Sequence, residues 1–268
     1  MGIYEVFAEF NMFETLEEIM VRPSGTGALG LKKKDNKKKE STDEIDVKVH
    51  IHMILEILML SLVQAPRYLR DYCISQHQTV LKYPLLTYIF DRTINHEDPI
   101  IQNMLGEVIK HLIDSSEYEE VQIQVLFYEK FLAKLLEIFD INSTEEKIRN
   151  AKSVVLDVLI YCCKQQMESL KKRIVPLDIS GKIFKNFATN DKFLIITIIQ
   201  LYKLVLQCKD AEIVSHLAKP LDVIIDYFTK NCKNKTNLLH SSLLEVFVLI
   251  MKEELLPLLN YIVKEQNF

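Results

Sequence analysis

Glycine and proline are scarce in this chain, which has six glycines and seven prolines among 268 residues. Sheet proteins connected by many tight turns need more of both, so this scarcity favours helices. The net charge of −4 is too small to indicate a nucleic-acid partner or an acidic tail. The longest apolar runs, near His52–Val63 and Phe193–Leu206, carry polar residues and are shorter than the roughly 18–20 residues of a membrane span. We therefore expect neither a nucleic-acid partner nor a membrane segment.

Residue patterns of a catalytic or metal site are also missing. No serine, cysteine or threonine stands in a nucleophile motif, and the paired glutamates fall at the surfaces or ends of predicted helices: Glu17–Glu18, Glu119–Glu120 and Glu253–Glu254. His50 and His52 are two residues apart on a predicted helix, so they do not share a face. The scattered histidines His111, His216 and His240 are predicted to be half-buried packing residues. The sequence thus predicts no enzyme activity, no cofactor and no metal.

The cysteines give no sign of disulfides or of a zinc site. They are odd in number, they lack CxxC spacing, and most lie in apolar or helical stretches: Cys73, Cys162, Cys163, Cys208 and Cys232. We expect buried, reduced thiols. The first residues, MGIYEVFAEF, lack the charged and apolar regions of a signal peptide, so we expect a soluble intracellular protein.

A repeated helical pattern dominates the chain. Leu243–Val263 predicts a long apolar helix, a polar break at Lys252–Glu254 and a shorter helix. Similar segments recur at Leu55–Ile74, Leu156–Val175 and Leu201–Leu217, with a weaker copy at Leu105–Ile113. Their anchor leucines are 43 to 51 residues apart: Leu55, Leu105, Leu156, Leu201 and Leu244. Units of roughly 40–47 residues are typical of HEAT and armadillo arrays. The pattern predicts an all-α, armadillo/HEAT-like helical-repeat superhelix, an α-solenoid of right-handed type with about five or six repeats.

Composition divides the chain into three parts. Residues 1–22 are predicted to be N-terminal helices of the array, residues 23–42 a flexible lysine-rich insertion, and residues 43–268 the repeat domain. The insertion holds three glycines and the run LKKKDNKKKE, and it cannot bury enough apolar surface to offset its ordering entropy. Its Gly25–Gly30 segment formally matches the dinucleotide pattern GxGxxG. A predicted helix and Pro23 precede that segment and lysines follow it, which favours a linker over a nucleotide site.

The lysines of the insertion leave two interpretations open. They form a bipartite-looking cluster: Lys32, Lys33, Lys34, Lys37, Lys38 and Lys39. The cluster is either a nuclear import signal or a solvated basic loop. No aromatic residues interleave these lysines, which disfavours a single-stranded nucleic-acid platform.

Local signals predict several helix boundaries. Thr42 and Asp43 are expected to cap the helix that runs to about Gln64. One continuous helix is expected over Glu120–Phe139, and Ser143 with Glu146 is predicted to form a capping box. Further helices are expected at Ser180–Ala188 and Asn237–Lys252.

The C-terminal third resembles the central domain of the regulatory subunit 3 family of protein phosphatase 4, the SMEK family. The resemblance is strongest over Lys233–Lys264, where the family reads Tyr-Asn-Leu-Leu-Asn-Ser-Ala ahead of a similar long helix. Here the corresponding residues are Thr236, Asn237, Leu238, Leu239, His240, Ser241 and Ser242. Collinear matches extend upstream at Lys219-Pro220-Leu221, His216-Leu217, Lys209-Asp210, Phe193–Leu206, Ala151–Val175, Gln64–Ile74 and, faintly, Ile3–Met20. The resemblance therefore covers most of the chain apart from the insertion.

This resemblance implies a non-catalytic regulatory or scaffold subunit. Its expected partners are a serine/threonine phosphatase 4 catalytic subunit and a companion regulatory subunit, in the nucleus and cytoplasm. The partner-binding candidates are at the best-matched turn: Lys233, Lys235, Asn237 and His240. A generic armadillo/HEAT-type adaptor, in nuclear transport or kinase scaffolding, is the alternative. The family's EVH1-like domain and acidic tail are missing, so we expect the distal part of the helical domain alone.

Overall fold

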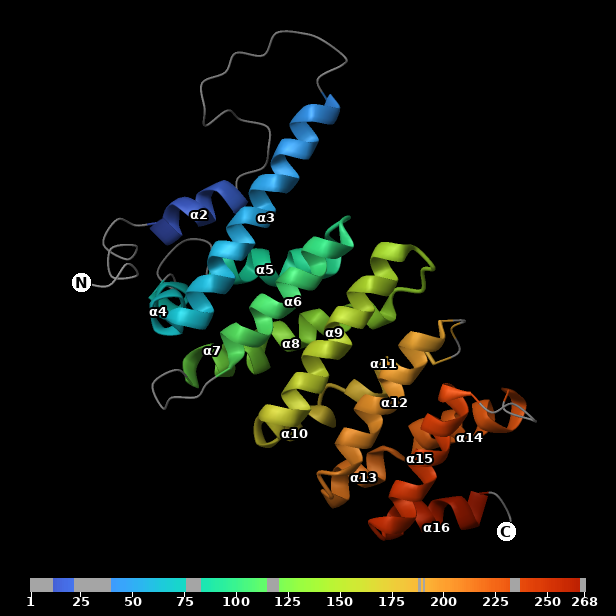
Figure 1. The fold of residues 1–268 in the computed structure, drawn as a ribbon. Helices are drawn as coiled ribbons and strands as arrows, with labels where there is room; N and C mark the ends of the chain where they lie inside the picture. The colour runs from blue at the N-terminus through green and yellow to red at the C-terminus, as the bar shows by residue number, and fades with distance from the viewer. Residues whose placement is uncertain are drawn as a thin grey trace. The chain divides into compact units, whose positions relative to one another are not determined.

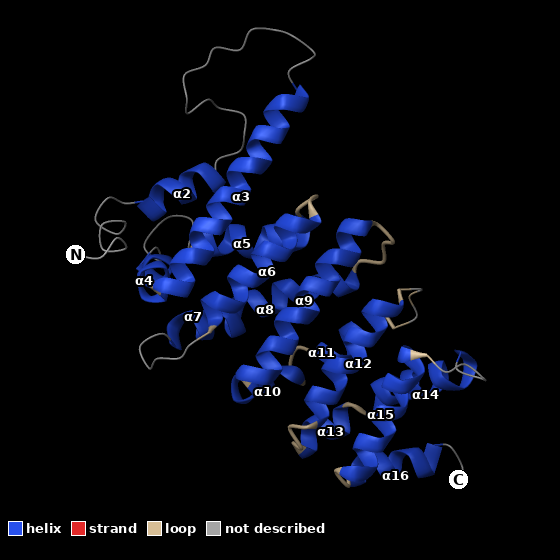
Figure 2. Cartoon of the chain, in the orientation of Figure 1, coloured by secondary structure: helices blue, strands red, loops and turns tan. Residues whose placement is uncertain are grey.

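The computed structural model describes residues 12–21, 40–75, 83–114, 121–187, 189, 191–231 and 237–265. Throughout these residues the regular structure is helical, and Figure 2 draws no strand among them. The predicted all-α repeat fold is therefore confirmed. The chain divides into two compact units, residues 1–127 and residues 128–268.

The first unit is built around two long helices that pack against each other, α3 and α6 (Figure 1). Shorter helices cover them, with α5 against α6, α4 against α3 and α2 against α5. The helices of this unit are α2 (Met12–Val21), α3 (Glu40–Gln64), α4 (Pro66–Ser75), α5 (Pro84–Asn95), α6 (Pro99–Ile113) and α7 (Val121–Leu126). A π-helical turn, η3 (Phe127–Phe131), follows α7.

The second unit stacks three long helices side by side, with α12 between α9 and α15 (Figure 1). Two shorter helices follow each of the first two long ones, and one follows the last. The elements are α8 (Leu132–Leu136), η4 (Glu137–Asp140), α9 (Glu146–Gln165), α10 (Met167–Ile174), α11 (Ile179–Phe184), α12 (Lys192–Leu206), α13 (Ala211–His216), α14 (Ala218–Asn231), α15 (Leu238–Lys252) and α16 (Leu256–Glu265).

The spacing of the long helices confirms the repeat. Helices α6, α9, α12 and α15 begin at Pro99, Glu146, Lys192 and Leu238, which are 46 or 47 residues apart. An aspartate or asparagine caps several helices: the side chains of Asp98, Asp191, Asp210 and Asn237 accept hydrogen bonds from first-turn amides of α6, α12, α13 and α15. Such caps satisfy amides that have no partner within the helix. Three of the four long helices, α6, α12 and α15, thus begin with an Asp or Asn cap, whereas α9 has no side-chain cap.

Four of the five anchor leucines lie in the core. Leu55, Leu105, Leu156 and Leu201 are buried. The fifth was predicted one residue out of register, because Leu244 is 41% exposed and the neighbouring Leu243 is fully buried. Both leucines are compatible with an apolar helix, so the sequence alone does not tell which of the two faces the neighbouring helices.

Three expected boundaries were wrong. The helix predicted over residues 120–139 is divided into α7, η3, α8 and η4, and this change of helical phase lets Phe127, Tyr128 and Phe131 all point inward. Ser143 forms no capping box, because its Oγ accepts from the Glu145 amide at 3.2 Å and α9 begins only at Glu146. Helix α3 begins at Glu40, so Thr42 and Asp43 lie inside it rather than at its cap.

Among the described helices, no single one is long and apolar enough to cross a membrane. Val49–Gln64 and Pro66–Ser75 meet the length and composition test only as a pair, and that pair is bent by 113°. The inward side of both helices is packed in the first unit, with Leu58 and Leu69 almost fully buried.

Candidate protein-interaction surface

The best-matched turn has a well-defined structural role where the structure describes it. The Asn237 Oδ1 accepts a hydrogen bond from the His240 amide at 2.9 Å and caps α15. The His240 ring stacks on Phe228 of α14, with ring centroids 5.2 Å apart. Phe228 also makes an edge contact with Phe247 of α15, at 5.7 Å. Asn237 and His240 thus connect α14 with α15, and their partner-binding role remains a prediction.

The other predicted site residues lie outside the described residues. Lys233 and Lys235 precede α15, and the lysine cluster of residues 32–39 precedes α3.

Sequence reasoning missed two exposed apolar residues at the start of α12 and α15. Phe193, the second residue of α12, is 82% exposed, and Leu238, the first residue of α15, is 68% exposed. Phe193 is the second residue after the capping Asp191, and Leu238 directly follows the capping Asn237. An apolar residue one or two positions after an Asx cap, outside the buried stripe of its helix, is the signal that could have revealed them.

Ion pairs between repeats show that α12 and α15 run in the same direction. Lys203 Nζ lies 2.5 Å from Glu245 Oε2, and beyond the helix ends Lys209 Nζ lies 2.6 Å from Glu253 Oε2. The N-termini of α12 and α15 are therefore at the same end of the second unit. Phe193, Asn237, Leu238 and His240 together form what we call the α12–α15 edge.

Charged side chains elsewhere in the second unit also connect neighbouring repeats. Arg149 of α9 approaches the capping carboxylate of Asp191 at 3.9 Å. The hydrogen bond from Lys209 lowers the pKa of Glu253 below its usual value. Among the described residues, no group of three or more histidine, cysteine, aspartate or glutamate side chains could hold a metal ion. In the first unit, the His52 Nε2 lies 3.4 Å from the Glu56 Oε1, one turn along α3.

A buried lysine connects three segments of the second unit and was not predicted. Lys152 of α9 is 5% exposed. Its ammonium donates to the Ile141 carbonyl and to the Asn186 Oδ1, both at 2.7 Å. Asn186 in turn donates to the Phe139 carbonyl at 2.9 Å. Burial lowers the pKa of Lys152. The lysine holds the loop before α9 against the turn after α11, which is a structural role.

The described cysteines are free thiols, as the sequence predicted. Cys73, Cys162 and Cys163 are buried, and Cys208 is partly exposed. Burial raises the pKa of Cys162 to about 12 and raises the pKa of Cys73 and Cys163 as well. A thiol that stays protonated is a poor nucleophile, so these groups behave as apolar core atoms.

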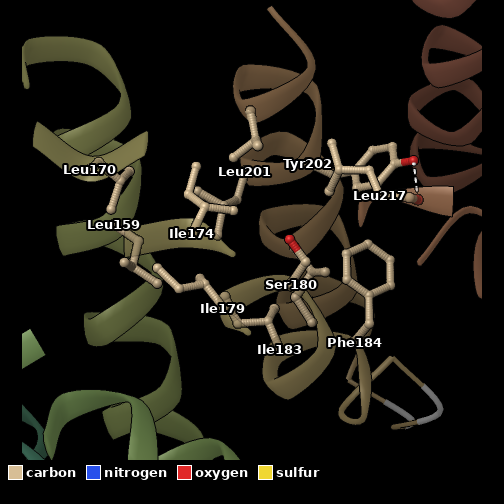
Figure 3. A pocket seen from close by; sticks show the side chains of 12 residues that line it. Leu159, Leu170, Ile174, Ile179, Ser180, Ile183, Phe184, Leu201, Tyr202 and Leu217 are labelled. Atoms are coloured by element: carbon tan, nitrogen blue, oxygen red, sulfur yellow. Dashed lines mark hydrogen bonds between the residues drawn. The ribbon is translucent and has the colours of Figure 1, made fainter. Parts of the chain in front are cut away.

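A small apolar cavity lies in the core of the second unit between α9, α11 and α12 (Figure 3). Its volume is about 20 Å³, and its lining includes the side chains of Ser180 and Tyr202. The Tyr202 hydroxyl already donates to the Leu217 carbonyl at 3.1 Å. A space of this size accommodates at most one water, so it is a packing gap rather than a ligand pocket.

Comparison with known proteins places the chain in a family. The model of the family described as phosphatase 4 regulatory subunit 3 matches residues 37–267. The chain belongs to the phosphatase 4 regulatory subunit 3 family. The resemblance drawn from the sequence is thereby confirmed, except that Ile3–Met20 lies outside the matched range.

Two curated relatives support the same conclusion. Suppressor of Mek1 from Dictyostelium discoideum is 26% identical over 233 residues, which covers 78% of this chain and 22% of the relative. Serine/threonine-protein phosphatase 4 regulatory subunit 3 from Drosophila melanogaster is 23% identical over 229 residues, which covers 80% of this chain and 23% of the relative. The chain spans less than a quarter of the length of these relatives. No solved structure matches it.

Proposed function

We propose that this chain is a non-catalytic regulatory or scaffold component of a protein phosphatase 4 complex. The observation that carries the proposal is the family match over residues 37–267, which includes the long helices α6, α9, α12 and α15 in full. Helical arrays bind partners through extended surfaces, with energy concentrated in a few apolar anchors. The serine/threonine phosphatase 4 catalytic subunit and a companion regulatory subunit are the proposed partners.

The proposed contact is the α12–α15 edge. Phe193 and Leu238 are large apolar side chains exposed at neighbouring helix starts, where no internal packing requires them. Interface anchors are enriched in aromatic residues, and truncating such an anchor typically costs about 2 kcal/mol or more of binding free energy. The prediction that Asn237 and His240 contribute would place them beside these anchors.

The test is reconstitution from purified components. The chain is mixed with recombinant phosphatase 4 catalytic and companion subunits, and affinity is measured by isothermal titration calorimetry. We expect complex formation that Phe193→Lys weakens by about 30-fold or more. Ile100→Lys is the matched control, because Ile100 is 62% exposed and is also the second residue of a capped long helix, α6. Failure of the intact chain to bind either subunit would refute the proposal.

The chain is expected to supply no catalytic residue, so on its own it should not hydrolyse a phosphoserine peptide above the buffer rate.

The lysine cluster at residues 32–39 is proposed to support nuclear import of a protein present in nucleus and cytoplasm. Replacing its six lysines with alanine should reduce nuclear accumulation of a tagged chain, and an unchanged distribution would make the cluster a basic linker.

A further inference from the structure

Helix α2 is held on the first unit by one apolar side. Phe13, Leu16 and Met20, at positions i, i+3 and i+7, are buried, whereas Ile19 on the same helix is 56% exposed. The helix packs on α5, and the Phe13 ring lies against the Tyr72 ring of α4 with centroids 5.6 Å apart. This is the way in which an amphipathic helix is held by a binding partner, with anchors at i, i+3 and i+7.

A carboxylate on the same side of α2 gives the contact a polar centre. The Tyr72 hydroxyl donates to the Glu17 Oε2 at 3.1 Å. The backbone amide of Leu85, in the first turn of α5, interacts with the same carboxylate. The N-cap residue of α5, Tyr83, provides no side-chain cap, and first-turn amides favour a negatively charged acceptor. Glu17 thus serves the start of α5 from another helix.

We call the surface under α2 the α2 seat, made of Tyr72 and Cys73 of α4 and Leu85 of α5. Helix α2 has ten residues, and isolated helices shorter than about 12–15 residues are marginal in water. It is therefore helical because it is docked, and only a few side chains hold it there. The seat helices α4 and α5 lie within residues 37–267, the range that matches the family, whereas α2 precedes that range.

We propose that the α2 seat binds an amphipathic helix of a partner protein, and that α2 occupies it in the free chain. The partner helix is expected to carry apolar side chains at i, i+3 and i+7 and a carboxylate at i+4, as α2 does. The apolar side chains supply contact area, and the carboxylate at Tyr72 and Leu85 sets the register. Such a helix must displace α2, so residues 12–21 act as a competitor within the chain. This site is in the first unit and does not depend on the α12–α15 edge.

Cys73 reports whether the seat is covered. It follows Tyr72 in α4 and is fully buried. Burial and, second, the charge of Glu17 raise the pKa of its thiol, so α2 lies close to it. When α2 leaves, Cys73 should become open to alkylation, and its labelling rate should follow the population of the open state. Cys162, buried in the second unit, shows whether the whole chain unfolds.

The first experiment is native-state alkylation of the full chain with iodoacetamide, in which mass spectrometry follows each cysteine. Leu16→Asp places a charge on the buried side of α2, so Cys73 should be labelled at least about tenfold faster while Cys162 is unchanged. Ile19→Asp is the matched control, because it makes the same kind of change at an exposed position of the same helix and should label as wild type does. Unchanged labelling of Cys73 in Leu16→Asp, equal acceleration by Ile19→Asp, or acceleration that extends to Cys162 would overturn the exchange of α2.

The second experiment tests binding by a separate helix. A synthetic peptide of residues 12–21 with blocked ends is added to the Leu16→Asp chain. A tethered segment acts at an effective concentration on the order of millimolar, so the peptide at about 2 mM should occupy the open seat and slow labelling of Cys73 about twofold or more. The same peptide with Glu17→Ala should protect Cys73 less. Lack of protection by the first peptide, or equal protection by the second, would overturn the binding of a partner helix.

Discussion

The hydrogen bonds of Lys152 indicate how much its replacement should lower the free energy of unfolding. In Lys152→Met the aliphatic stem keeps most of its volume, so no large cavity opens. The Ile141 carbonyl and the Asn186 Oδ1 each lose a donor that lies 2.7 Å away. A buried acceptor left without its donor costs about 1–3 kcal/mol. Loss of the lysine's own desolvation penalty offsets part of this cost, so we expect a net destabilisation of about 2 kcal/mol.

The coupling between Lys152 and Asn186 separates this explanation from a simple packing effect. Asn186→Ala alone removes the acceptor for Lys152 and the donor to the Phe139 carbonyl. Because the two residues share one network, the double variant should lose less than the sum of the single losses, by about 1 kcal/mol. The measurement is urea denaturation followed by circular dichroism, with amide hydrogen exchange of α9 as a local readout, because repeat arrays need not unfold in one step.

The pH dependence gives an independent readout. Burial lowers the folded-state pKa of Lys152 below its ordinary value of 10.5, so the folded chain binds fewer protons than the unfolded chain between those two values. The contribution of Lys152 to stability therefore rises as pH increases through that window, and the gap between wild type and Lys152→Met should widen there. Lys164→Met, at an exposed position on the same helix, is the control and should stay within about 0.5 kcal/mol of wild type. A loss below about 0.5 kcal/mol in Lys152→Met, or purely additive single variants, would refute the reasoning.

Three further predictions concern other contacts of the second unit. Asn237→Ala should cost about 1 kcal/mol through the lost cap of α15 and Asn237→Ser much less, as thermal unfolding would show. Cys162, whose pKa burial raises to about 12, should resist Ellman's reagent at neutral pH until the chain unfolds. The hydrogen bond from Lys209 lowers the folded pKa of Glu253 below 4.5, so its contribution is present above pH 4.5 and is lost as pH falls through the folded pKa. Glu253→Gln should therefore flatten the acid side of the stability profile, and an unchanged profile would contradict that assignment.

Hydrophobic periodicity predicted the long helices well because the fold buries their apolar faces. Phe193–Leu206 is apolar on several faces in sequence, and α12 is packed between α9 and α15. The start of α15 at Leu238 also agrees with the helix predicted over Asn237–Lys252. Local chemistry was enough here, since an Asx cap and an apolar run specify the same boundary.

Sequence reasoning failed where two local solutions have similar energy. Ser143 can cap a helix or close a short turn, and the turn at Glu145 prevailed. The aromatic-rich run from Phe127 to Phe131 can continue as an α-helix, but a π-helical turn buries Phe127, Tyr128 and Phe131 together. Lys152 is a charged residue in a helix and reads as solvent-facing, although its partners come from segments 11 and 34 residues away. Such long-range partners leave no trace in local periodicity.

The same limit explains why apolar content alone cannot locate binding surfaces in this family member. Leu206 and Met251 are both apolar residues near the ends of long helices in adjacent repeats, yet the first is fully buried and the second is 61% exposed. The intrinsic preferences of the two side chains are alike, so the packing around each position, and not its composition, sets this difference. The exposed apolar residues Phe193 and Leu238 therefore become informative only once the neighbours of each helix are known.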